Sequence, residues 1–119
     1  MEQITKNGTV IAVISGEGVV ITDAQSALDL AMTVKYETGA ENIILEKAAL
    51  AEDFFRLSTG LAGEILQKFI NYHVKAAVYG DFSQYDSKAL KDFIYESNHG
   101  KDFFFTATKD EAIQKLTEK

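Results

Sequence analysis

The 119-residue sequence contains no cysteine and no proline, and its formal net charge is -6. Without cysteine the chain forms neither disulfides nor thiolate metal sites, and it has no cysteine nucleophile. This composition predicts a protein of the cytoplasm. The acidic charge argues against nucleic-acid and anionic-membrane partners, because both require a basic surface.

Long apolar segments are also missing. No apolar run approaches the roughly 20 residues of a membrane span. The first six residues lack the basic and apolar regions of a signal peptide. Because 46% of the residues are hydrophobic, the chain can bury a core, and we expect one domain over residues 1–119.

Short apolar strands alternate with helical patterns along the chain. A tight hairpin is expected at Asn7-Gly8, because both central positions of a type I′ turn need positive φ. Strands are expected at 2–6, 9–15, 19–21, 42–45, 74–79 and 103–105. Helices are expected from Asp23 to Gly39, from Ser58 to His73, from about Asp86 to Asn98, and after Thr108. Residues 46–57 fit either a helical turn or a structured loop.

This alternation predicts right-handed parallel crossovers after an antiparallel N-terminal hairpin. The expected fold is therefore a single α/β domain, with a mixed sheet of five or six strands and four α-helices.

Polar residues follow the predicted parallel strands. Ligands of open parallel sheets bind outside the carboxyl ends of the strands. The candidate ligand-binding residues at this rim are Asp23, Glu52, Arg56 and Asp81. Arg56 is the only arginine and can clamp a phosphate or carboxylate. Structural roles are equally available, namely an N-cap for Asp23, a turn for Asp81 and a solvated surface for the other two.

Neither a catalytic residue nor a cofactor is predicted. His73 and His99 end helices, so both should lie near the amino ends of strands, on the rim opposite Ser58, where neither can act as its base. Carboxylates at the carboxyl rim can hold Mg²⁺. Because simpler roles explain each carboxylate, we assign no metal site.

The run Leu57–Gly63 places two hydroxyls and two glycines at a predicted helix start. Such a run can cap the helix, seat an anion, accept a phosphate or dock a partner. It has neither the length nor the Lys-Ser/Thr of a P-loop. Gly60 and Gly63 would each cost about 1 kcal/mol relative to alanine inside a helix. Close packing on the sheet or close approach of a partner would explain them.

Ser58-Thr59-Gly60-Leu61 and the order of elements resemble the STAS fold of bacterial anti-sigma factor antagonists. Those proteins carry an Asp-Ser-Ser/Thr-Gly-Leu motif at the start of a helix that follows a central strand. The resemblance implies a STAS-like fold, a phosphorylatable Ser58 and a helix start that faces a protein partner. Leu57 stands where that motif has its aspartate.

A broader resemblance covers nearly the whole chain. The sequence is similar to a bacterial family described as domain of unknown function 4180. The segments that carry this similarity are 21–23, 26–29, 51–55, 57–69, 80–83, 91–98 and 101–105. The resemblance implies a family but no activity.

We therefore expect a non-enzymatic regulatory module that binds an unidentified protein partner through Ser58, Thr59, Gly60 and Leu61. The alternative is a small-molecule or anion-binding protein, or a weak enzyme, with its site at the carboxyl ends of the strands. A homodimer is a third expectation, since a few of the eight phenylalanines and five tyrosines can cover a partner surface.

Overall fold

The computed structural model describes residues 1–118. In this part of the chain a five-stranded mixed sheet comprises β1 (Glu2–Lys6), β2 (Thr9–Ile14), β3 (Asn42–Glu46), β4 (Lys75–Tyr79) and β5 (Phe103–Thr106). Four α-helices accompany it, namely α1 (Ala24–Thr38), α2 (Leu61–Asn71), α3 (Lys88–Asn98) and α4 (Lys109–Thr117). β1 is antiparallel to β2, and the remaining pairs are parallel. The predicted α/β class, hairpin and number of helices are confirmed.

The hairpin between β1 and β2 closes as its sequence predicts. Asn7 and Gly8 have φ values of 54° and 80°. Lys6 pairs with Thr9 directly across the turn. The two-residue loop therefore fixes the register of the hairpin.

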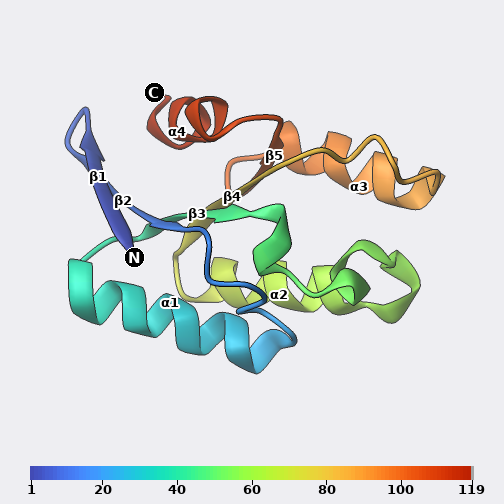
Figure 1. Cartoon of the computed structure of the whole chain (residues 1–119), viewed down its shortest axis with the longest axis horizontal. Coiled ribbons are helices and arrows are strands. Elements are labelled where there is room, and N and C mark those ends of the chain that lie inside the picture. Colours follow the sequence, from blue (N-terminus) through green and yellow to red (C-terminus); the bar gives the residue numbers. More distant parts are fainter. Residues whose placement is uncertain (119) are drawn as a thin grey trace.

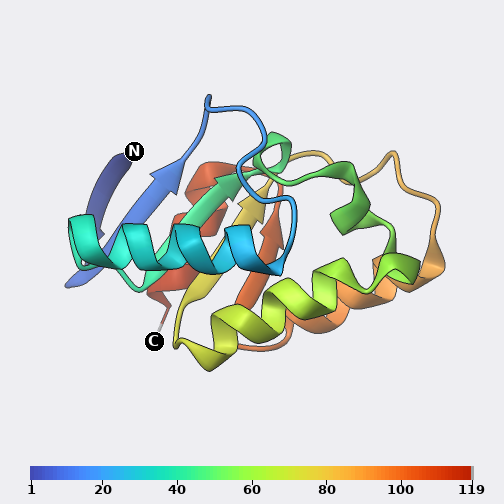
Figure 2. The same ribbon diagram turned by 90° about the horizontal axis from the view of Figure 1, so that it is seen from below.

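The strands lie in the sheet in the same order as in the chain, β1-β2-β3-β4-β5. Right-handed crossovers that all advance in one direction place their helices on one face of a sheet. Accordingly, α1 and α2 lie side by side against one face, and α4 lies against the other (Figures 1 and 2). Within residues 1–118 the strand order never reverses, so this sheet lacks the topological switch point at which open α/β sheets commonly bind ligands.

Two hydrophobic cores share the sheet. The larger core combines one face of β2 to β5 with α1, α2, Leu90 of α3 and two phenylalanines that precede α2. The smaller core joins Ile11, Val13, Ile44, Ala77 and Phe104 to Ala112 and Leu116 of α4. Each of the three central strands thus buries both of its faces, which accounts for their continuous apolar sequences.

The ambiguous segment between β3 and α2 forms three 3₁₀ turns, η1 (Lys47–Ala49), η2 (Glu52–Phe55) and η3 (Leu57–Thr59). Phe54 and Phe55 of η2 are 1% and 3% exposed. Their burial stabilises the segment by roughly 1.5–3 kcal/mol per side chain. Stacking of Phe54 on Phe103 at 6.2 Å joins η2 to the sheet.

The prediction of a strand at 19–21 was wrong. Ile21 forms only an isolated parallel bridge with Leu50. The N–H groups of Val20 and Ile21 both donate to the carbonyl of Ala49. This segment therefore pairs with the 3₁₀ turn η1 and adds no strand to the sheet.

The prediction that a helix begins at Ser58 was also wrong, because α2 begins at Leu61. Gly60 lies between η3 and α2 with φ 75°, a left-handed conformation that interrupts the helical path. The end of this helix was predicted more closely, since α2 stops at Asn71 and His73 has φ 58°.

Candidate functional site

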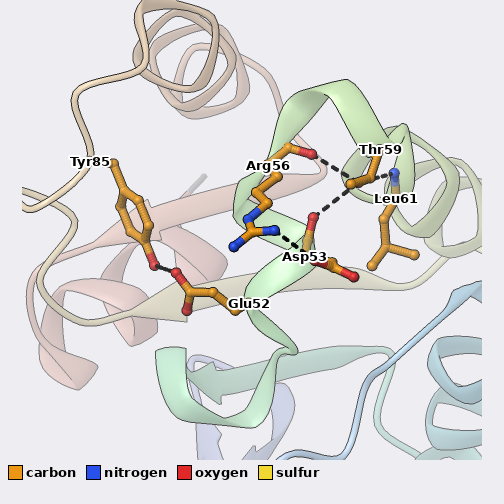
Figure 3. Close-up of polar contacts among 6 residues, drawn as sticks. All are labelled: Glu52, Asp53, Arg56, Thr59, Leu61 and Tyr85. Atoms are coloured by element: carbon orange, nitrogen blue, oxygen red, sulfur yellow. Dashed lines mark hydrogen bonds and ion pairs between the residues drawn. The ribbon is translucent and has the colours of Figure 1, made fainter.

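Gly60 is the N-cap of α2 and has no side chain, and the side chain in the run 58–61 that bonds to the start of this helix is that of Thr59. The Thr59 hydroxyl accepts the Leu61 N–H at 3.2 Å. It also lies within donating distance of the carbonyl oxygens of Arg56, at 2.8 Å, and Asp53, at 3.0 Å (Figure 3). Thr59 thereby connects η2, η3 and the first residue of α2.

Ser58 is exposed, and its hydroxyl has no hydrogen-bond partner among residues 1–118. Together with Arg56 and Asp86 it lines a groove of about 450 Å³ between η3 and the segment before α3. Gly63 in the first turn of α2 also faces open space, because a Cβ there would meet nothing within 4 Å. Close packing on the sheet therefore does not explain Gly63.

Asp23 acts as the N-cap of α1. Its carboxylate accepts the Ser26 N–H at 2.8 Å, and the Ser26 hydroxyl accepts the Asp23 N–H at 3.1 Å. The backbone bond from Ser26 is the main reason that the pKa of Asp23 lies below its usual value. The structure thus favours the capping role for this candidate and leaves it outside the cleft described next.

A cleft of about 600 Å³, here called the strand-end cleft, opens where β3 and β4 end. It is lined by Val19, Glu46, Lys47, Ala48, Leu50, Glu52, Tyr79, Gly80, Asp81 and Gln84. Of the four ligand-binding candidates, the cleft contains Glu52 and Asp81. Asp23 and Arg56 are not among its lining residues.

Lys47, the first residue of η1, contacts the loop that follows β4. Its Nζ donates to the carbonyl oxygen of Asp81 at 3.0 Å and lies 4.7 Å from the centre of the Tyr85 ring. The Lys47 Cβ would stand 2.7 Å from a Cβ at residue 80, so only glycine fits at that position. The ammonium of Lys47 is therefore engaged by groups of the protein itself.

Glu52 of the strand-end cleft is linked to Tyr85, which lines the neighbouring groove beside Ser58. The Tyr85 hydroxyl donates to Oε1 of Glu52 at 2.9 Å (Figure 3). Burial, and then the hydrogen bond and charge of Glu52, raise the pKa of Tyr85 to about 12. The Tyr85 ring also stacks on Phe55 at 5.2 Å, so the residue that holds Glu52 packs against the larger core.

The other two carboxylates are each anchored by one oxygen. Oε1 of Glu46 accepts the Gly16 N–H at 2.7 Å. Oδ1 of Asp81 accepts the hydroxyl of Ser83 at 2.6 Å and its N–H at 2.9 Å. These bonds from Ser83, the hydroxyl bond first, hold the pKa of Asp81 below its usual value. Both groups therefore keep a fixed position with one further oxygen free of hydrogen bonds from residues 1–118.

Arg56 lies apart from the strand-end cleft. Its guanidinium is 3.8 Å from Oδ1 of Asp53, and its side chain is 70% exposed. Such a pair contributes at most about 1 kcal/mol to stability. Within the described residues, Arg56 lines the groove that also contains Ser58, whereas Asp81 lines the strand-end cleft, so the ligand-binding candidates lie around separate openings.

The histidines lie near the amino ends of strands, as predicted. His73 stands two residues before β4, and His99 follows α3 ahead of β5. His99 Nδ1 is 2.8 Å from the carbonyl oxygen of Tyr95. Among residues 1–118, no three His, Asp or Glu side chains are grouped to hold a metal ion. In the same residues, no helix has the length and apolar character needed to cross a membrane.

These observations define an α/β domain with a negatively charged cleft at the carboxyl ends of two central strands. The family model for a domain of unknown function, DUF4180, matches residues 6–116. The chain therefore belongs to this family. No curated protein and no solved structure matches the chain, and the STAS-like resemblance stays a prediction.

Proposed function

We propose that this protein binds a small molecule carrying a protonated amine in the strand-end cleft. The observation that carries the proposal is the imbalance of charge in the lining, where three carboxylates accompany one ammonium. The ammonium, on Lys47, is already engaged by the Asp81 carbonyl and the Tyr85 ring. The cleft therefore offers a ligand carboxylate oxygens that can accept hydrogen bonds.

The geometry favours an organic ligand over a bare metal ion. The carboxylates come from separate segments, namely the end of β3, the turn η2 and the loop after β4. The volume of about 600 Å³ lies in the range of small-molecule sites. Val19 and Leu50 supply apolar wall beside the carboxylates. A ligand with an amine and a short carbon frame matches both kinds of surface.

The sequence also predicted an anion as an alternative ligand, and the charges of the cleft argue against it. Glu46, Glu52 and Asp81 would repel a phosphate or carboxylate in the cleft. Arg56, the residue that suggested an anion, belongs to a different groove.

Isothermal titration with putrescine, ethanolamine and glucosamine, and with succinate and phosphate as matched anions, tests the proposal. We expect the amines to bind and the anions not to bind. Loss of one charge-assisted hydrogen bond, worth about 1.5–3 kcal/mol, should weaken amine binding by tenfold or more in Glu52→Gln and in Asp81→Asn. Asp53→Asn removes a neighbouring carboxylate outside the cleft and should leave binding unchanged. Failure of all three amines, or equal loss in Asp53→Asn, would overturn the proposal.

A second candidate function is the regulatory docking surface predicted at Ser58. Two observations favour it. The hydroxyl of exposed Ser58 has no hydrogen-bond partner among residues 1–118, and the space outside Gly63 is open. A phosphate on Ser58 would add negative charge close to the N-terminal end of α2. This candidate function is the one that the resemblance to STAS proteins implies. For both proposed functions we also propose that the protein acts in the cytoplasm.

Affinity capture from bacterial cytosol with Ser58→Glu, Ser58→Ala and Gly63→Ala chains tests the docking surface. A partner that binds wild type and Ser58→Ala but not Ser58→Glu supports a phosphate-gated surface. Gly63→Ala should stabilise α2 by up to about 1 kcal/mol while weakening the same partner, because the added methyl blocks close approach. Identical partner sets for all four chains would exclude this function.

A further inference from the structure

The two edge strands of the sheet differ in whether their outward backbone groups have hydrogen-bond partners. At the β5 edge, the side-chain amide of Asn98 acts as a short substitute strand. Its Oδ1 accepts the Phe105 N–H at 2.7 Å, and its Nδ2 donates to the Phe105 carbonyl at 3.1 Å. At the opposite edge, β1 pairs with β2 on one side only among residues 1–118.

The β1 edge has a definite set of free backbone groups. In a two-residue hairpin, the residues that flank the turn exchange hydrogen bonds, and hydrogen-bonded pairs then alternate along the strands. Because Lys6 and Thr9 flank the turn, the backbones of Glu2, Ile4 and Lys6 face β2. The N–H and C=O groups of Gln3 and Thr5 therefore face outward, ready to pair with another strand.

The sequence of β1 is complementary to itself when the second strand is antiparallel. With a two-fold axis at Ile4, Glu2 lies opposite Lys6 of the second copy, and Gln3 lies opposite its Thr5. Gln3 and Thr5 then form the hydrogen-bonded pairs. Glu2 and Lys6 fall at non-hydrogen-bonded pairs, where opposing Cα atoms approach to about 4.5 Å and side chains are closest.

We propose that two copies of this chain pair through antiparallel β1 strands centred on Ile4 and form one continuous sheet. Glu2 is 3.3 Å from Lys109 of α4, so it lies on the face that α4 covers. By strand alternation Ile4 and Lys6 share this face. Ile4 is half-buried against the smaller core and would gain its counterpart as a neighbour. Each Glu2 would then lie between Lys109 and Lys6 of the other copy.

Charged residues on an edge strand commonly serve to prevent pairing. Here the two charges are opposite and equally distant from Ile4, so they discriminate between arrangements. A parallel arrangement places Glu2 beside Glu2 and Lys6 beside Lys6, whereas the antiparallel arrangement joins unlike charges twice. The charge pattern therefore favours antiparallel over parallel pairing of two β1 strands.

Sedimentation velocity over a concentration series tests the pairing, because the expected dimer association depends on charge. Lys6→Glu converts two unlike contacts into two like contacts, and it should lower the association constant by about tenfold or more at low salt. Glu2→Lys should act in the same way. An equimolar mixture of the two variants should restore association, because a β1 strand that is acidic at both ends then faces one that is basic at both ends.

Thr5→Pro provides a test that does not depend on charge. Proline removes an N–H that faces outward and is tolerated on edge strands, so thermal stability should change little while the dimer is lost. Wild type that remains monomeric up to about 1 mM overturns the proposal. A dimer that survives both Thr5→Pro and Lys6→Glu, or single variants that fail to associate when mixed, also overturns it.

Discussion

Removal of the Asn98 side chain tests the closure of the β5 edge. In Asn98→Ala both bonds to Phe105, at 2.7 Å and 3.1 Å, are lost at once. Phe105 is only 5% exposed, so its N–H and C=O lose their partners where water has poor access. A buried backbone group left unpaired costs about 1–3 kcal/mol. Because the Asn98 site is itself half-buried, we expect an unfolding free energy lower by about 2–4 kcal/mol.

Urea denaturation followed by far-ultraviolet circular dichroism measures this change. Asn71 offers a matched control, since it is also the last residue of its helix, but in the described part of the chain its side chain bonds only to exposed Gln67. We expect Asn71→Ala to change stability by less than about 0.5 kcal/mol. If Asn98→Ala and Asn71→Ala differ by less than that amount, water replaces the amide and Asn98 does not close the edge.

The effect of a charge beside the Phe105 backbone can be tested by a second substitution at residue 98. Asn98→Asp keeps an acceptor for the Phe105 N–H but turns a second carboxylate oxygen toward the Phe105 carbonyl. Its folded-state pKa should therefore be raised. The destabilisation of this variant should then shrink as the pH falls through that raised pKa, and the change should be complete by about pH 4, because the protonated acid can donate a hydrogen bond.

Two further predictions concern Gly80 of the strand-end cleft and Tyr85, which bonds to Glu52 of that cleft. Gly80→Ala should lower stability by about 1–3 kcal/mol in the same urea assay, because its Cβ would meet the Lys47 Cβ at 2.7 Å; an unchanged midpoint would contradict the contact. Tyr85 should ionise near its raised pKa of about 12, which an ultraviolet titration of Tyr85→Phe against wild type can identify. Because a raised tyrosine pKa stabilises the folded state below pH 10 and loses that effect as pH rises through 12, Tyr85→Phe should flatten the alkaline loss of stability. Glu52→Gln should lower this pKa only in part, since burial is its larger cause.

The parts of the fold that were predicted correctly are those governed by local rules. The Asn7-Gly8 turn, the Asp23 cap and the left-handed Gly39 all act on neighbouring residues, and each appears as expected. The prediction of a strand at 19–21 was wrong because these apolar residues contact other parts of the chain and do not pair within the sheet. Ile21 is buried against η1, while Val19 is 55% exposed at the cleft. A short apolar run does not reveal which neighbour will pair with it.

The candidate site was predicted less well, because its geometry depends on contacts across the chain. Glu52 and Asp81 meet in one cleft since the ends of β3 and β4 are adjacent, which the parallel alternation does imply. Tyr85 was missed because its bond to Glu52 spans 33 residues. The close approach of Lys47 to Gly80 likewise has no local signal. Arg56 was misplaced because the three turns of 47–59 could not be resolved from their composition.

The agreement between strand order and chain order has a consequence for how the protein is made. Each strand from β2 onward pairs with the strand that precedes it in the chain. When a strand is synthesised, the strand it pairs with is therefore already available. Synthesis from the N-terminus can therefore extend the sheet one strand at a time, starting from a hairpin whose contacts are local. Asn98 emerges just before β5, and the last strand thus meets its cap as soon as it docks. The chain carries the terminator of its own sheet immediately ahead of the strand that needs it.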